Sequence, residues 1–165
     1  LCGVNVAVIN YIGDKRYSAS ELSTHDGRTI PCIWADHLKG QEAISTVKEA
    51  QVILINEGQF FADIVEWVTE QVEDHQKIVF VCGLDGDFKR ESFGSWLDLI
   101  PLCDEVIKLT ALCSMCKRQS GLFSKRITTD TNQVLIGTDQ YIPVCRRCYK
   151  ISVQSPELNM EKVLK

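Results

Sequence analysis

The chain has 165 residues, of which 45% are hydrophobic and 24% charged, and these values are ordinary for a soluble globular protein of one domain. Lys and Arg total 18 against 22 Asp and Glu, so the formal net charge of −4 argues against nucleic acid as a partner. No apolar run approaches the roughly 18 residues of a membrane span, and no secretory signal opens the chain. We therefore expect a soluble, cytoplasmic protein with no membrane partner.

Three short apolar runs predict the strands of a sheet. They cover residues 4–9, 52–55 and 78–81, are rich in valine and isoleucine, and show no polar alternation. Between the second and third runs, apolar residues recur at helical spacing over Ile64–Val72. Such a strand, helix, strand unit predicts an α/β fold whose parallel strands are buried on both faces by helices. Ligands bind such sheets at the carboxyl ends of the strands.

Weaker patterns predict the elements around this unit. We expect a helix over Gln41–Ala50, another over Phe93–Ile100 that Pro101 stops, and a short strand over Val106–Leu109. After Thr110 two β-prone segments, 122–128 and 133–136, predict a hairpin pinned by cysteines. The sequence thus predicts an α/β core over 1–109, a small module over 110–150 and a loosely attached tail over 151–165.

The cysteines divide into two kinds. Two C-x-x-C pairs, separated by 28 residues, can supply four thiolates to one tetrahedral ion, and we expect a structural zinc site at Cys113, Cys116, Cys145 and Cys148. A redox pair and an iron–sulfur cluster are the alternatives. We expect the scattered cysteines to be small buried apolar side chains; they are Cys2, Cys32, Cys82 and Cys103.

Polar residues follow directly on the apolar strand that ends at Ile55. Asn56, Glu57 and Gln59 stand where an α/β fold does its chemistry, and a carboxylate such as Glu57 can accept a proton from an attacking hydroxyl. The alternative is a helix cap with Asn56 as the N-cap residue.

Together the motifs resemble the zinc-containing thymidine kinases. The resemblance runs from about Val4 to Tyr149 and rests on the order and spacing of five segments. These are Asn-Glu-Gly-Gln-Phe-Phe at 56–61, Cys-Gly-Leu-Asp-Gly-Asp-Phe-Lys-Arg at 82–90, Phe-Gly at 93–94, Lys-Leu-Thr-Ala-Leu-Cys at 108–113, and Tyr141 before Val-Cys-Arg-Arg-Cys-Tyr at 144–149. The resemblance implies a P-loop-kinase-like parallel sheet, with a zinc-binding hairpin called a lasso.

The family transfers the γ-phosphate of ATP to the 5′-hydroxyl of thymidine or deoxyuridine with Mg²⁺, in pyrimidine salvage for DNA synthesis, and commonly forms homotetramers. The resemblance implies that Glu57 is the catalytic base and that Asp14, Arg16 and Asn56 lie near the phosphates and the metal. It also implies a nucleoside site built from Gln59, Phe60, Leu84, Phe88, Phe93, Tyr141 and the lasso residues Gln133, Ile136 and Gly137.

Two features depart from the family pattern. No G-x-x-x-x-G-K-[ST] loop occurs in the 165 residues, so we expect this stretch alone not to bind ATP productively, and we expect the strand at 4–9 to be an exposed edge. Asn56 stands where the family usually has an Mg²⁺-binding Asp, and Asp85 or Asp87 could compensate.

Three possibilities stay open: a kinase with further amino-terminal sequence, a degenerate subunit of a larger assembly, and a nucleoside-binding module. A zinc-ribbon nucleic-acid reader, suggested by Arg146 and Arg147, is disfavoured by charge.

Overall fold

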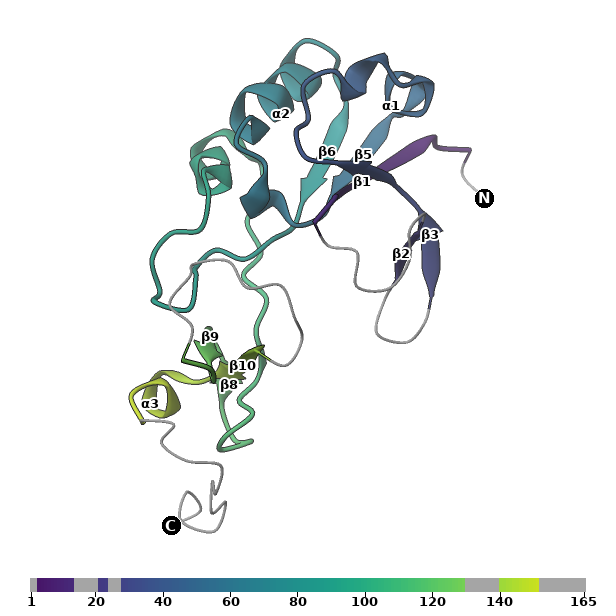
Figure 1. Cartoon of the computed structure of the whole chain (residues 1–165). Coiled ribbons are helices and arrows are strands. Elements are labelled where there is room, and N and C mark those ends of the chain that lie inside the picture. The colour runs from purple at the N-terminus through teal and green to yellow at the C-terminus, as the bar shows by residue number, and fades with distance from the viewer. Residues whose placement is uncertain (1–2, 14–20, 24–27, 130–139, 152–165) are drawn as a thin grey trace. The chain divides into compact units, whose positions relative to one another are not determined.

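The computed structural model describes residues 3–13, 21–23, 28–129 and 140–151 (Figure 1). The chain divides into two compact units. Residues 1–85 and 93–104 form the first, called here the α/β unit, while residues 86–92 and 105–165 form the second, called here the cysteine unit. Among the described residues no helix is both long and apolar enough to cross a bilayer.

The α/β unit is built on a four-stranded sheet in the order β4-β1-β5-β6. The strands are β1 (Val6–Tyr11), β4 (Ile33–Ala35), β5 (Val52–Ile55) and β6 (Ile78–Val81), and every pairing is parallel. Helix α2 (Ile64–Glu73) connects β5 to β6. The predicted strand, helix, strand unit and the α/β class are confirmed.

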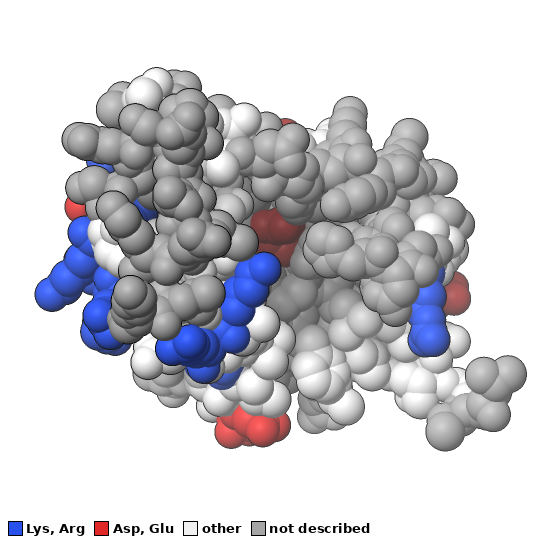
Figure 2. Space-filling view, turned by 90° about the horizontal axis from the view of Figure 1, so that it is seen from below, with Lys and Arg blue, Asp and Glu red and all other residues white. Residues whose placement is uncertain are grey.

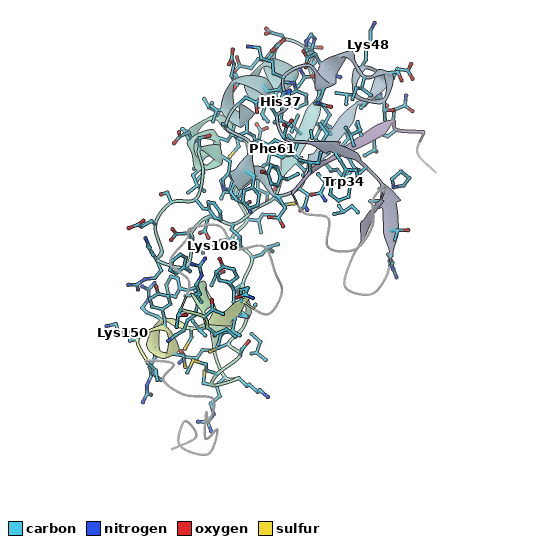
Figure 3. All side chains as sticks on the ribbon, in the orientation of Figure 1. Trp34, His37, Lys48, Phe61, Lys108 and Lys150 are labelled. Carbon is cyan, nitrogen blue, oxygen red and sulfur yellow. The ribbon has the colours of Figure 1, made fainter. Side chains whose placement is uncertain are left out.

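A buried apolar cluster lies against one face of this sheet. Ile9, Ile53 and Ile55 point into it, together with Phe61, which is fully buried and is labelled in Figure 3. Helix α2 adds Ile64, Trp67 and Val68, and the other helical segments add Val47 and Leu99. Within the described residues the helices therefore cover one face, whereas we expected both. On β6, Ile78 is 58% exposed and Phe80 is 60% exposed.

The exposed edge is not the strand that we expected. Strand β1 lies inside the sheet between β4 and β5, and its residues Ala7, Val8 and Ile9 are buried. The three-residue strand β4 occupies the outer position beside β1, and it is too short to give a pattern in the sequence. The expected exposure is confirmed only at the start of the segment, where Val4 and Val6 are exposed, and the outer strand β6 carries exposed Ile78 and Phe80 as well.

The predicted helix over Gln41–Ala50 is two shorter elements. A 3₁₀ turn, η1 (Gln41–Ala43), precedes helix α1 (Ser45–Glu49), because Ile44 between them is extended with φ −69° and ψ 129°. The predicted start of the next helix at Phe93 is also wrong, since a 3₁₀ helix, η3, runs over Trp96–Leu102. This helix includes Pro101, so the proline does not stop it.

Two further expectations differ from the structure. Residues 106–109 form no strand, and Val106, Ile107 and Leu109 are exposed, because no described strand pairs with them. A two-stranded antiparallel ribbon, β2 (Glu21–Ser23) with β3 (Thr29–Pro31), was not predicted, because its strands are only three residues long.

The described residues of the cysteine unit form short antiparallel ribbons and one helical turn. Strand β7 (Ala111–Leu112) pairs with β8 (Ser120–Gly121), and β9 (Phe123–Arg126) pairs with β10 (Tyr141–Val144). Helix α3 (Arg146–Tyr149) follows. The first segment of the predicted hairpin thus contains β9, but its partner is β10; residues 133–136 and most of the tail lie outside the described part of the chain.

Candidate functional site

Polar side chains from three neighbouring strands meet at the carboxyl edge of the sheet. Asn10 near the end of β1 is fully buried, and its Oδ1 accepts a hydrogen bond of 2.9 Å from Nδ2 of Asn56, which follows β5. The Cys82 thiol, which follows β6, donates to Oδ1 of Asn56 at 3.1 Å. Asn56 is therefore held from both sides, as expected for polar groups at this edge of a parallel sheet. Asn10 was not predicted to take part.

The Cys82 thiol remains a hydrogen-bond donor at neutral pH. Desolvation, followed by the negative charge of Glu57, raises the pKa of Cys82. A protonated thiol can donate to the carbonyl oxygen of Asn56, whereas a thiolate would repel it. The amide oxygen of Asn56 is thereby kept in a defined orientation.

Glu57 has an unusual backbone conformation. Its φ of 57° and ψ of 43° lie in the left-handed region, which costs a residue with a side chain free energy; Gln76, Arg90 and Lys117 also have a positive φ. A 3₁₀ turn, η2 (Gly58–Phe60), begins directly after it, and no side chain caps this turn, so the alternative of Asn56 as an N-cap residue is wrong. Nε2 of Gln59 donates to Oε2 of Glu57 at 2.5 Å.

Gln59 connects this turn to the segment after β6. Its side chain is buried, and its Oε1 accepts the backbone N–H of Leu84 at 3.0 Å while its Nε2 bonds Glu57. A Cβ atom on Gly83 would lie 2.3 Å from Oε1 of Gln59, so only glycine leaves room for this contact. The carboxylate of Glu57 is thus positioned by a buried amide that is itself fixed at its other end.

An aromatic cluster lies beside the turn. The rings of Tyr11 and Phe60 stack with centroids 4.6 Å apart, and the ring of Phe93 meets Phe60 edge-on at 5.3 Å. Nε1 of Trp96 donates to the carbonyl oxygen of Leu84 at 3.0 Å. The structure thus places Phe60 next to Phe93, and it adds Tyr11, for which a lone tyrosine at a strand end gave no signal.

A double-mutant cycle tests the pairing of the two asparagines. We expect Asn10→Ala and Asn56→Ala to show a coupling energy of about 0.5–1.5 kcal/mol in the free energy of unfolding, because one hydrogen bond joins the two side chains. Urea denaturation at 25 °C measures it. Asn10→Ala combined with Glu73→Ala, an exposed position on α2, should be additive within the error of the cycle. Additivity of the asparagine pair would contradict the bond.

Gly94 lets two backbone segments approach closely. Its φ is +69°, and a Cβ atom there would lie 2.1 Å from the backbone carbonyl oxygen of Gln59. Gly40 is a matched control, since its φ is +92° but nothing lies within 4 Å of a Cβ. We expect Gly94→Ala to lower the free energy of unfolding by about 1–3 kcal/mol more than Gly40→Ala does, through overpacking against Gln59. Thermal or urea unfolding of both variants measures this difference, and equal losses would contradict it.

Four cysteines of the cysteine unit converge on one point. The sulfur atoms of Cys113, Cys116, Cys145 and Cys148 all lie within 4.8 Å of one another, and Cys116 and Cys145 are 3.9 Å apart. Tetrahedral coordination with metal–sulfur bonds of about 2.3 Å places sulfur atoms roughly 3.8 Å apart. Figure 3 shows the sulfur atoms gathered beside α3. The cluster can therefore hold a metal ion, and its four ligands leave no open position.

The thiols of this cluster differ in acidity. Burial opposes ionisation of Cys113, but hydrogen bonds from the backbone N–H groups of Cys116, Cys145 and Met115 lower its pKa to about 6. Burial and the hydrogen bonds with neighbouring thiols raise the pKa of Cys148 to about 12. One sulfur thus accepts negative charge readily while another resists it, and a cation favours ionisation of all four.

Basic residues neighbour the four cysteines in the sequence. Exposed Lys and Arg side chains stand between and beside the cysteines, at Lys117, Arg118, Arg146, Arg147 and Lys150. Figure 2 shows basic side chains gathered along one side of the visible face. Four thiolates around a divalent ion leave a doubly negative centre, and nearby cations offset that charge.

The remaining cysteines are not the buried core residues that we expected. Cys82 and Cys103 are exposed, and Cys32 is half-buried. Each lies outside the cluster, and Cys2 is not among the described residues.

The predicted site residues divide between the two units. Asn56, Glu57, Gln59, Phe60, Leu84 and Phe93 belong to the α/β unit, whereas Phe88, Tyr141 and the four cysteines belong to the cysteine unit. Asp14, Arg16, Gln133, Ile136 and Gly137 lie outside the described residues. Asp87 accepts the backbone N–H groups of Lys89 and Glu91 at 2.8 and 3.0 Å, which gives it a structural role in a turn.

Fold and site define an α/β protein with a cysteine-rich module that can hold a metal ion. A family model described as "Thymidine kinase" matches residues 1–149. A "Thymidine kinase" of Oryza sativa subsp. japonica is 46% identical over 154 residues, covering 88% of this chain and 55% of the relative. "Thymidine kinase a" of Arabidopsis thaliana is 43% identical (89% and 63% covered), and "Thymidine kinase, cytosolic" of Cricetulus griseus is 46% identical (89% and 62% covered).

The chain belongs to the thymidine kinase family, as its motifs predicted. It spans between 55% and 63% of the length of these three relatives.

Proposed function

We propose that the full-length protein is a thymidine kinase, which transfers the γ-phosphate of ATP to the 5′-hydroxyl of thymidine or deoxyuridine. Family membership supports the reaction class. The observation that carries the proposal is the carboxylate of Glu57, held in a strained conformation at the carboxyl edge of the sheet by a buried glutamine. What sets Glu57 apart from the other residues with a positive φ is its place at the carboxyl edge of a parallel sheet, where ligands bind.

In this proposal Glu57 accepts the proton of the 5′-hydroxyl as that oxygen attacks the γ-phosphorus. Gln59 holds the carboxylate, and the turn that begins at Gly58 keeps it at the sheet edge. Mg²⁺ bound with ATP supplies charge neutralisation at the phosphates. Asn56 offers a carbonyl oxygen, and Asp14 and Arg16 are proposed to lie near the phosphates. Asp85 is the remaining acidic candidate to offset the charge that Asn56 lacks.

We propose that the nucleobase is recognised by aromatic and aliphatic walls together with backbone groups. Phe60, Leu84 and Phe93 in the α/β unit and Phe88 and Tyr141 in the cysteine unit are the proposed walls. The lasso residues Gln133, Ile136 and Gly137 are proposed to bind the edge of the base. A flat ring with a polar rim suits such a site.

We propose that the metal of the cysteine unit is a structural zinc ion. Four sulfur ligands with the observed spacing fit Zn²⁺ and close its coordination shell, so the ion supplies rigidity rather than chemistry. The buried core of this unit supports that role, since it consists largely of the ligands themselves, with Met115 and Val144. Without the ion so small a core would hold few elements together.

We further propose a homotetramer in the cytosol that serves pyrimidine salvage. The name "Thymidine kinase, cytosolic" of the Cricetulus griseus relative supports the location.

A catalytically degenerate subunit of a larger assembly is the second candidate, and Asn56 favours it because an amide cannot supply the negative charge of an Asp opposite a cation.

The test is an assay of the full-length protein with thymidine, ATP and Mg²⁺, in which we expect thymidine monophosphate and ADP in equal amounts. Omission of Mg²⁺ should abolish the reaction. Thymidine binding without any product, measured by calorimetry, would favour the degenerate subunit. If the protein neither bound thymidine nor formed product, both candidate functions would be contradicted.

A further inference from the structure

Residues 86–92 leave the α/β unit and belong to the cysteine unit. They form a braced turn in which Gly86 and Ser92 pair as an antiparallel bridge and the N–H of Asp87 bonds the carbonyl oxygen of Glu91 at 2.9 Å. The Asp87 carboxylate, which is buried, accepts two further N–H groups of the turn. Phe88 is thus carried on a rigid turn, which needs an anchor to fix its position.

Tyr149 supplies that anchor. Its hydroxyl donates a 2.6 Å hydrogen bond to the backbone carbonyl oxygen of Phe88, 61 residues away in the sequence. The guanidinium of Arg90 lies 4.3 Å from the centroid of the Tyr149 ring, and the ring of Phe123 meets it at 5.6 Å. Since Tyr149 directly follows Cys148, one step along the chain joins the metal ligand to the residue that holds Phe88.

Lys125 of β9 holds the end of α3 that carries Tyr149. Nζ of Lys125 donates to the carbonyl oxygens of Cys148 and Tyr149 at 3.3 and 2.9 Å and also to that of Ile151. A cation on the last carbonyl groups of a helix satisfies acceptors that lack an intrahelical partner. Tyr149 is therefore held by β9 on one side and by Cys148 on the other.

Arg126 fixes the ring of Phe88. Its guanidinium lies 3.7 Å from the centroid of that ring and 5.0 Å from the centroid of the Tyr141 ring, and its Nη2 donates to the Tyr141 hydroxyl. Arg126 is only 9% exposed, and the planar face of its guanidinium lies against these two rings. Both rings are proposed walls of the nucleobase site.

We propose that Tyr149 and Arg126 are positioning residues that orient Phe88, and that the nucleoside affinity of the protein depends on them. The inference rests on the proposed function, in which Phe88 is a wall of the nucleobase site. Neither residue is assigned a contact with the substrate. Each acts through Phe88, one on its backbone and the other on its ring.

Kinetics of the full-length protein test this assignment. We expect Tyr149→Phe to raise the KM for thymidine by about 2–13-fold, the equivalent of one hydrogen bond, with kcat and the KM for ATP unchanged. Arg126→Lys keeps the charge but loses the planar face, and should raise the same KM by about 2–30-fold. Arg146→Lys is the matched control, because the guanidinium of Arg146 lies over a different ring, that of Phe123, 5.0 Å from its centroid. It should leave the KM unchanged.

The decisive variant removes the ring. In a Phe88→Ala background, Tyr149→Phe and Arg126→Lys should each change the KM by less than about 2-fold, because the group that they orient is absent. Metal content measured for each variant should equal that of the unmodified protein. Equal effects with and without the Phe88 ring, or no effect of either variant on the KM, would overturn the proposal.

A measurement without nucleoside separates this proposal from the proposed function. We expect Tyr149→Phe to increase amide hydrogen exchange in residues 86–92 by about 2–13-fold while exchange in β5 and β6 stays unchanged. Unchanged exchange in 86–92 would overturn the positioning role even in an active kinase. Faster exchange in a protein that does not bind thymidine would instead overturn the proposed function.

Discussion

Replacing Glu57 by Gln should lower kcat for thymidine phosphorylation by about 10²–10⁴-fold, the contribution usual for a positioned general base. The amide has nearly the shape of the carboxylate but cannot accept the proton of the 5′-hydroxyl. The KM for thymidine should change little, because Glu57 is assigned no role in binding the base. Initial rates at saturating ATP and Mg²⁺ measure the effect.

The structure indicates that Glu57→Gln removes the proton acceptor but keeps the side chain in place. Gln59 donates to Oε2 of Glu57, and the carbonyl oxygen of a glutamine at position 57 can still accept that bond. Glu73→Gln, at an exposed position in the last turn of α2, removes the same charge far from the reaction and should leave kcat unchanged. A loss smaller than about tenfold at position 57 would show that another group accepts the proton.

Replacing Cys148 by Ser should abolish zinc binding and, with it, measurable nucleoside affinity. Three thiolates and a hydroxyl form a much weaker site, and structural zinc contributes on the order of 10 kcal/mol or more to folding in small zinc domains. Among the described residues of the cysteine unit, the buried cluster consists of Cys113, Cys145 and Cys148 with Met115 and Val144, so three of its five members are thiols of the metal site. The α/β unit has its own core and should stay folded.

Metal content, calorimetry with thymidine and hydrogen exchange of β1 and β5 together measure this outcome. Cys103→Ser is the matched control, because Cys103 is exposed and its thiol donates only to the carbonyl oxygen of Ile100 at 3.2 Å, which a hydroxyl can replace. It should keep both zinc and affinity. Loss of protection in β1 and β5 on Cys148→Ser would contradict the independence of the two cores.

Long periodic patterns in the sequence predicted the fold well, and short or irregular segments did not. The strand, helix, strand unit from Val52 to Val81 was placed within one residue, because a ten-residue amphipathic helix between two β-branched runs has few alternatives. The three residues of β4 are too few for a pattern. The run at 106–109 has strand composition, but in the described residues it has no neighbour to pair with.

The candidate site was predictable where chemistry depends on local spacing. The cysteine pairs and the segment after β5 are contiguous motifs, so their residues could be named in advance. Asn10 and Tyr11 are brought to the site only by the register of β1 beside β5, which pairs Ile9 with Ile55. Arg126 and Tyr149 meet Phe88 across long stretches of chain, and nothing in the local sequence indicates such contacts.

Residues 86–92 belong to the cysteine unit, although the segments on either side of them belong to the α/β unit. The chain therefore passes from one unit to the other three times, after residues 85, 92 and 104. No single cut therefore separates the units. A fragment ending at Asp104 would carry the turn at 86–92 without Tyr149 and Arg126, and a fragment beginning at Glu105 would lack Phe88. Limited proteolysis at residue 104 should leave the two pieces associated through that turn, and separately expressed pieces should complement each other in trans.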